Sequence, residues 1–205
     1  MHELNNFIYD CVYSFLLGII QGFTEFLPIS STAHLKVVPY LFGWNDPGVS
    51  LSASLQLGSA FAIIFYFRSD IYLIINSFYS IFKHRKPFKD ENTKLASYIV
   101  IASMPILFFG LLVKLYWPGY SNSALRGLFS IAIISIIMSL LLALSEIYGK
   151  RKKLFTDIKL SDIIFLGISQ SLAIIPGVSR SGVTLTSALF SGIERKTAAR
   201  LSFLV

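Results

Sequence analysis

The chain has 205 residues, of which 54% are hydrophobic and only 14% are charged. This balance excludes a soluble globular domain and indicates a single membrane domain, because lipid accepts apolar side chains but requires backbone polar groups to be paired within helices. The formal net charge of +7 sits mainly in short loops between apolar runs, as in the cytoplasmic loops of membrane proteins. We therefore predict a polytopic, all-α membrane protein that does not bind nucleic acid. The lone Cys11 excludes an intrachain disulfide and a cysteine-based metal site.

The first apolar segment, residues 7–27, is interrupted before it forms a clean membrane span. Pro28 ends it, and the hydroxyls of Ser30, Ser31 and Thr32 can cap a following helix. The pattern predicts helix, loop and helix at membrane depth, which is tolerated only inside protein or beside a wet cavity. This loop is therefore a candidate site.

The middle of the chain alternates apolar spans with loops of contrasting composition. We predict spans at 51–67, 95–116 and 125–147, whereas 71–82 is too short to span and either lies at the interface or extends the preceding helix. The basic loops 83–94 and 150–159 are predicted to be cytoplasmic, and the uncharged, aromatic turn 117–123 is predicted to lie outside.

A second interrupted segment begins near residue 160. Residues 163–175 enter the membrane, Pro176 and Gly177 break the helix, and a new apolar segment starts at Leu201. The stretches 17–34 and 166–184 look like copies of one another. Both open with Leu-Gly-Ile-X-Gln, pass a proline and end in clustered hydroxyls. The chemistry is therefore expected in these two stretches.

Gln21 and Glu25 lie four residues apart, on one face of the first predicted helix. They either hold a divalent cation or position a water, or they form a helix-packing hydrogen bond. We favour the functional interpretation, because an acid within a membrane segment usually faces the bundle interior or a cavity. His34, which follows the hydroxyl cluster, is either a nucleophile or general acid–base group, or a hydrogen-bonded structural residue.

Arg180 is the most informative single residue of the second stretch. A charge at the centre of a membrane helix costs roughly 2.5–3.5 kcal/mol, so it requires a partner. The sequence Pro-Gly-X-Ser-Arg-Ser-Gly precedes a predicted helix, and both a helix N-terminus and a guanidinium favour phosphate. We favour phosphate binding over the alternative, an ion pair with Glu25 in the opposing copy.

These motifs resemble those of the bacterial undecaprenyl-diphosphate phosphatase (bacitracin-resistance) family. The resemblance rests on Gln21-X-X-X-Glu25 with Leu-Pro-Ile-Ser-Ser-Thr-Ala-His34, and on Pro176-Gly-Val-Ser-Arg-Ser-Gly-Val-Thr184. It implies removal of the terminal phosphate from undecaprenyl diphosphate, which recycles the lipid carrier for peptidoglycan synthesis and confers bacitracin resistance. It also implies a divalent cation, Mg²⁺ or Ca²⁺, and inverted repeats with re-entrant segments. The active site would then open outward from the bacterial inner membrane.

The resemblance assigns roles to individual residues of this chain. It implies catalytic roles for Glu25, Ser31, His34 and Arg180, metal binding by Gln21 and Glu25, and substrate binding by Ser30, Gly177, Ser179, Arg180, Ser181 and Thr184. Gln21 departs from the Glu found in many relatives, so Glu25 would carry more of the metal binding. The nucleophile, whether His34, Ser31 or water, stays open.

The domain interpretation and the rival functions complete the predictions. Residues 1–205 form one membrane domain with repeat 1 at about 7–82, repeat 2 at about 160–205, and the spans 95–116 and 125–147 between them. Relatives continue through further helices, so the second repeat is expected to be incomplete. The rivals are a prenyl-phosphate transporter or flippase and an inactive truncated product. Membrane lipids and a prenyl diphosphate are the expected partners, and a homodimer is left open.

Overall fold

The structure is a computed structural model that describes residues 2–85 and 88–205. Lys86 and Pro87 of the predicted basic loop therefore lie outside the described residues. The α-helices in chain order are α1 (His2–Phe26), α2 (Ser31–Phe42), α3 (Gly48–Tyr66), α4 (Arg68–His84), α5 (Glu91–Tyr116), α6 (Leu128–Tyr148), α7 (Leu160–Gln170), α8 (Arg180–Phe190) and α9 (Arg195–Leu204). Short 3₁₀ turns are η1 (Tyr120–Asn122), η2 (Ala124–Arg126), η3 (Phe155–Asp157) and η4 (Ser171–Ile174).

The predicted polytopic helical architecture is confirmed. Within the described residues, four helices are long and apolar enough to cross a membrane: Phe7–Phe26, Gly48–Tyr66, Glu91–Tyr116 and Leu128–Tyr148. The segment predicted at 71–82 does not extend α3, because the helix is interrupted at Phe67 and α4 forms a helix of its own. Its place at the membrane interface stays a prediction. The final helix begins at Arg195, six residues before the predicted apolar segment. The division into repeats stays a prediction.

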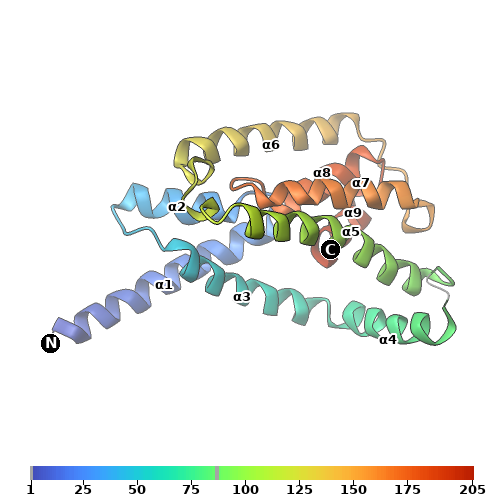
Figure 1. Ribbon diagram of the computed structural model, residues 1–205, viewed down its shortest axis with the longest axis horizontal. Helices are drawn as coiled ribbons and strands as arrows, with labels where there is room; N and C mark the ends of the chain where they lie inside the picture. The colour runs from blue at the N-terminus through green and yellow to red at the C-terminus, as the bar shows by residue number, and fades with distance from the viewer. Residues whose placement is uncertain (1, 86–87) are drawn as a thin grey trace.

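The ends of the molecule differ in chemical character (Figure 1). The basic loop before α5 and the basic loop after α6 lie at the same end, where the Lys94 ammonium donates to the Thr156 carbonyl at 2.9 Å. The turn between α5 and α6 lies at the opposite end, beside the C-terminal part of α2. The helical hairpin α1–α2 enters from that second end, and the hairpin α7–α8 enters from the basic end (Figure 1).

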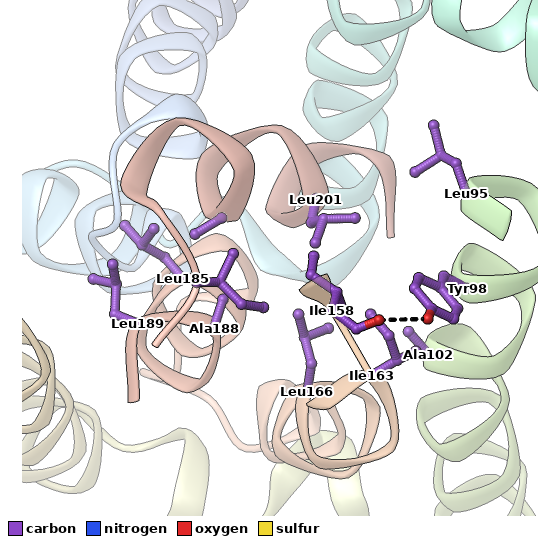
Figure 2. Close-up of a cluster of buried hydrophobic side chains, with 12 residues drawn as sticks. Leu95, Tyr98, Ala102, Ile158, Ile163, Leu166, Leu185, Ala188, Leu189 and Leu201 are labelled. Atoms are coloured by element: carbon purple, nitrogen blue, oxygen red, sulfur yellow. Dashed lines mark hydrogen bonds between the residues drawn. The ribbon is translucent and has the colours of Figure 1, made fainter. Parts of the chain in front are cut away.

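The apolar core is concentrated in the second half of the chain (Figure 2). Side chains from α5, α7, α8 and α9 are removed from solvent there, and the Tyr98 hydroxyl donates to the Ile158 carbonyl at 2.8 Å. By contrast, only 6% of the apolar stretch of α3 is buried inside the protein, so most apolar side chains of this helix face outward. Outward apolar side chains are the arrangement expected of a helix that faces lipid.

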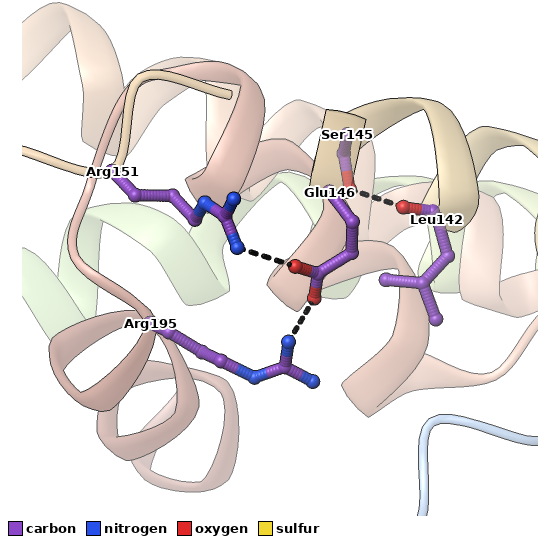
Figure 3. A network of polar contacts seen from close by, with 5 residues as sticks. All are labelled: Leu142, Ser145, Glu146, Arg151 and Arg195. Atoms are coloured by element: carbon purple, nitrogen blue, oxygen red, sulfur yellow. Dashed lines mark hydrogen bonds and ion pairs between the residues drawn. The ribbon is translucent and has the colours of Figure 1, made fainter. Parts of the chain in front are cut away.

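A polar network fastens the basic end of the bundle (Figure 3). Glu146, near the end of α6, accepts from the Arg151 guanidinium at 3.0 Å and from Arg195 at the start of α9. One carboxylate therefore ties α6, the following loop and α9 together. The chain is also tied there by a backbone bridge between Lys153 and Ile193.

Candidate active site

The first helical break is built by a proline and a capping serine. Helix α1 ends at Phe26, and Pro28 lacks the N–H that would continue it. Ser30 is the N-cap of α2, and its hydroxyl accepts from the Ala33 N–H at 3.2 Å. The predicted helix, loop and helix are therefore present, and the break is stabilised locally.

Glu25 is held in place by two donors from its own hairpin. The amide of Gln21 donates to Glu25 Oε2 at 2.9 Å, and the hydroxyl of Ser31 donates to the same oxygen at 2.8 Å. Gln21 is 1% exposed, and its Oε1 has no hydrogen-bond partner among the described residues. This arrangement leaves Glu25 Oε1 and Gln21 Oε1 as oxygens still able to accept or to ligate.

The second break is also formed by a local turn followed by an N-cap serine, here with Gly177 in the turn. Gly177 takes a φ of +98°, and a Cβ placed on it would lie 2.9 Å from the Ile131 carbonyl of α6. Glycine is therefore required both by the backbone conformation and by the close approach to α6. Ser179 is the N-cap of α8 and accepts from the Gly182 N–H at 3.1 Å, which makes Arg180 the first residue of that helix.

The tips of the two hairpins meet inside the bundle. The Ser181 hydroxyl donates to the Leu27 carbonyl at 3.3 Å, and a Cβ on Gly182 would lie 3.2 Å from the Pro28 carbonyl. Side chains separated by about 150 residues of sequence thus share one region. The contact places the N-terminus of α8 beside the loop that follows Glu25.

A cavity of about 480 Å³ lies between these tips, and we call it the catalytic cavity. Glu25 and Ser31 line it from the first hairpin, and Arg180 lines it from the second. The other predicted residues on its wall are Ser30, Ser179 and Ser181. Among the described residues no ion pair joins Arg180 to Glu25, so the predicted alternative of a structural ion pair is absent here. The guanidinium is left available for an anion.

Four predicted site residues do not line the catalytic cavity: Gln21, His34, Gly177 and Thr184. His34 and Gly177 line a neighbouring pocket of about 170 Å³ beside α6, although Ser30 and Ser179 belong to both spaces. Thr184 is fully buried, and its hydroxyl donates to the Arg180 carbonyl at 2.8 Å.

The contact of the His34 ring fixes its tautomer. Nδ1 lies 2.8 Å from the Ser30 carbonyl oxygen, which can only accept, so Nδ1 carries the proton in the neutral ring and Nε2 is the free nitrogen. The ring therefore touches the first turn of α2 rather than the Glu25 carboxylate.

Two further wall residues come from α3 and are not among the predicted site residues. Gln56 and Ser59 line the catalytic cavity, and Ser59 Oγ is buried without a hydrogen-bond partner among the described residues. The sequence did carry a signal for them. Polar side chains three residues apart within an apolar span share one helical face.

The donor set fits an oxygen-liganded cation. Hard cations such as Mg²⁺ use one or two carboxylates and complete their shell with water and substrate phosphates. Glu25 would supply one carboxylate. Gln21 Oε1, which is buried and unpartnered but not on the wall of the catalytic cavity, would supply a second oxygen. No group of three His, Cys, Asp or Glu side chains able to hold a metal occurs in the part of the chain described, so a cation here would depend on the substrate for further ligands.

Fold and site together define a class of protein. It is a polytopic helical membrane protein whose two broken hairpins enclose a cavity lined by one carboxylate and one arginine. Residues 14–205 match the family of the bacitracin resistance protein BacA, and the chain belongs to this family.

Three similar proteins share the name undecaprenyl-diphosphatase. An undecaprenyl-diphosphatase of Prochlorococcus marinus strain NATL1A is 76% identical over 203 residues, which cover 99% of this chain and 73% of the relative. Its counterpart in strain NATL2A is 74% identical over the same shares. The undecaprenyl-diphosphatase of strain SARG is 51% identical over 96% of this chain and 68% of the relative.

Proposed function

We propose that this protein is an integral membrane phosphatase that hydrolyses undecaprenyl diphosphate to undecaprenyl phosphate and inorganic phosphate. Membership of the BacA family and the name shared by the similar proteins support this substrate. The observation that carries the proposal is the catalytic cavity, in which a carboxylate–serine pair faces an arginine at a helix N-terminus. Such an activity recycles the lipid carrier for cell-wall synthesis and makes the cell resistant to bacitracin.

Arg180 and the N-terminus of α8 bind the diphosphate headgroup. A guanidinium matches two phosphate oxygens at once, and the N–H groups of the first helical turn attract the same charge. Because the Arg180 side chain forms no ion pair among the described residues, its charge is not already neutralised. Charge that develops on the transferring phosphoryl group is stabilised in the same place.

Ser31 and Glu25 form the reacting pair. A nucleophilic hydroxyl is recognised by a base within hydrogen-bond reach, and Ser31 Oγ lies 2.8 Å from Glu25 Oε2. Ser31 Oγ attacks the terminal phosphorus, its proton passes to Glu25, and the bond from that phosphorus to the bridging oxygen breaks. Undecaprenyl phosphate leaves, and water then hydrolyses the phosphoserine, regenerating the hydroxyl and releasing phosphate. His34 contacts the Ser30 carbonyl and so helps to position Ser31.

Gln21 and Glu25 would hold a divalent cation, Mg²⁺ or Ca²⁺, against the headgroup. When bound, such an ion supplies positive charge that offsets the phosphate oxygens. Gln21 contributes no charge of its own, so Glu25 is the residue on which cation affinity would chiefly depend. Because Glu25 is also the proposed base, the test is a direct titration with Mg²⁺, in which Glu25→Gln should bind the ion more weakly than the wild type.

The positive-inside bias supports an orientation in the bacterial cell membrane. With the basic loops 83–94 and 150–159 in the cytoplasm, the turn 117–123 and the hairpin α1–α2 face outward. The substrate headgroup then enters from the outer side while its prenyl chain stays in lipid. Cysteine labelling of an Asn122→Cys variant by an impermeant reagent on intact cells tests this orientation, because a cytoplasmic turn would stay unlabelled.

The deciding experiment is phosphate release from undecaprenyl diphosphate by the purified protein in detergent with Mg²⁺. We expect turnover by the wild type and loss of turnover in Arg180→Ala, with both proteins equally abundant in the membrane. If the wild-type protein were a pure transporter or an inactive product, it would release no phosphate. Phosphoserine at Ser31, trapped by acid quenching and detected by mass spectrometry, separates a serine nucleophile from water.

A further inference from the structure

A second cavity of about 570 Å³ adjoins the catalytic cavity, and we call it the outer pocket. It lies at the end of the molecule that carries the α5–α6 turn. Its wall comes from α2, the loop before α3, α3 itself, η1, η2 and the tip of the second hairpin. Thr32, Gln56, Ala173 and Val178 line both spaces. The outer pocket therefore adjoins the catalytic cavity and lies on the side of it that carries the α5–α6 turn.

Two cations line the outer pocket, and neither belongs to the two sequence motifs. Lys36 follows Thr32 by one helical turn on the same face of α2, and Arg126 is the last residue of η2. Lys36 Nζ lies 3.3 Å from Asp46 Oδ2, and its side chain is 23% exposed. Arg126 has no ion pair or side-chain hydrogen bond among the described residues.

The two spaces differ in net charge. Lys36 and Arg126 outnumber Asp46 in the outer pocket, whereas Glu25 and Arg180 balance one another in the catalytic cavity. Asp46 keeps its negative charge, so the excess is a single positive charge. Partial burial acts to raise the pKa of Asp46, but the Gly48 N–H and the charges of Lys36 and Arg126 outweigh it and lower the pKa. An anion released in the catalytic cavity meets an attractive potential on its outward path.

We propose that the outer pocket binds inorganic phosphate, held by Lys36 and Arg126, after the ion leaves the catalytic cavity. This inference rests on the proposed function, because that reaction generates phosphate next to the outer pocket. The guanidinium of Arg126 forms no ion pair or side-chain hydrogen bond among the described residues and can therefore bind the ion. Lys36 provides a second donor, which can turn from Asp46 to the ion. An arriving diphosphate headgroup offers the same chemistry, so the experiment must separate product from substrate.

The test compares the double variant Lys36→Gln/Arg126→Gln with the matched control Lys150→Gln/Lys152→Gln. Both pairs remove two positive charges, but the control lysines are exposed at the basic end of the molecule. We expect the inhibition constant of inorganic phosphate to rise about tenfold or more in the first variant, because two charge-assisted hydrogen bonds are lost. The KM for undecaprenyl diphosphate should stay within about twofold in both.

Direct binding of phosphate provides a readout that does not need turnover. An Arg180→Ala background removes the phosphate site of the catalytic cavity, and a calorimetric titration with inorganic phosphate then reports the outer pocket alone. We expect binding in Arg180→Ala and its loss in Lys36→Gln/Arg126→Gln/Arg180→Ala. If the wild type released no phosphate from the lipid, the proposed function would fail, yet this titration would still support or overturn the anion site.

Two results overturn the inference. A raised KM with an unchanged phosphate inhibition constant would show that the outer pocket receives the arriving headgroup instead. If the KM, the phosphate inhibition constant and the calorimetric titration were all unchanged in the Lys36→Gln/Arg126→Gln variants, Lys36 and Arg126 would bind no phosphate.

Discussion

Gly167 on α7 is the point where the second hairpin packs most closely against α5. A Cβ at this position would lie 2.7 Å from the Ala102 carbonyl oxygen and 2.8 Å from the Ala102 Cα. Ordinary contact begins near 3.4 Å, so Gly167→Ala must push the two helices apart by several tenths of an ångström. Both obstructing atoms belong to the backbone, so no side-chain rotation relieves the overlap.

The magnitude follows from two opposing effects. Overpacking costs about 1–3 kcal/mol, and obstruction by backbone places this site near the upper end. Alanine recovers up to about 1 kcal/mol over glycine through helix propensity. A net loss of about 2 kcal/mol corresponds to a melting temperature lower by about 4–8 °C for a chain of this size.

The assay is thermal unfolding in detergent, followed by the fluorescence of Trp44 and Trp117. Gly110→Ala is the matched control, because Gly110 also lies inside a membrane helix but has nothing within 4 Å of an added Cβ. The control should melt at the wild-type temperature or slightly above it. If Gly167→Ala melted as high as Gly110→Ala, the close approach of α5 and α7 would be refuted.

Three further predictions concern the catalytic cavity and the basic end. Arg180→Lys should lower kcat/KM for undecaprenyl diphosphate by about tenfold or more, because lysine keeps the charge but cannot bind two oxygens in a fork; equal activity would contradict bidentate binding. Ser31→Ala should lower kcat at least about 10²-fold and abolish phosphoserine trapping, whereas retained turnover would indicate water as the nucleophile. Glu146→Gln should lower the melting temperature by only about 2–4 °C, since each exposed ion pair contributes at most about 1 kcal/mol. Adding 0.5 M NaCl should reduce this difference, because salt screens ion pairs. A loss that does not depend on salt would contradict the network in Figure 3.

The sequence predicted the helical breaks because the signals that create them are local. Pro28 follows the end of α1, and Ser30 and Ser179 cap the next helix through their hydroxyls. Pro176 does not end α7 as predicted, because α7 already ends at Gln170 and the 3₁₀ turn η4 follows it. Hydropathy also located the spans, because a membrane helix must be apolar along most of its length. The start of α9 was predicted too late, because its first turns are charged and carry no apolar pattern.

The composition of the site depended on packing that no local pattern encodes. The sequence left His34 and Ser31 as alternative nucleophiles. The rotation of α2 against α1 and α6 places His34 in the neighbouring pocket and Ser31 beside the carboxylate. Gln56 and Ser59 show the converse, because their face of α3 became cavity wall only once the second hairpin was in place.

Local chemistry in the sequence thus determined the membrane class, the two interrupted hairpins and the residues able to bind a phosphate. Only the tertiary structure decided which of those side chains share a cavity, and that Lys36 and Arg126 line a pocket that adjoins it. The physical reason is that a helix fixes the angular spacing of its side chains. The direction in which that set faces is fixed by the neighbouring helices.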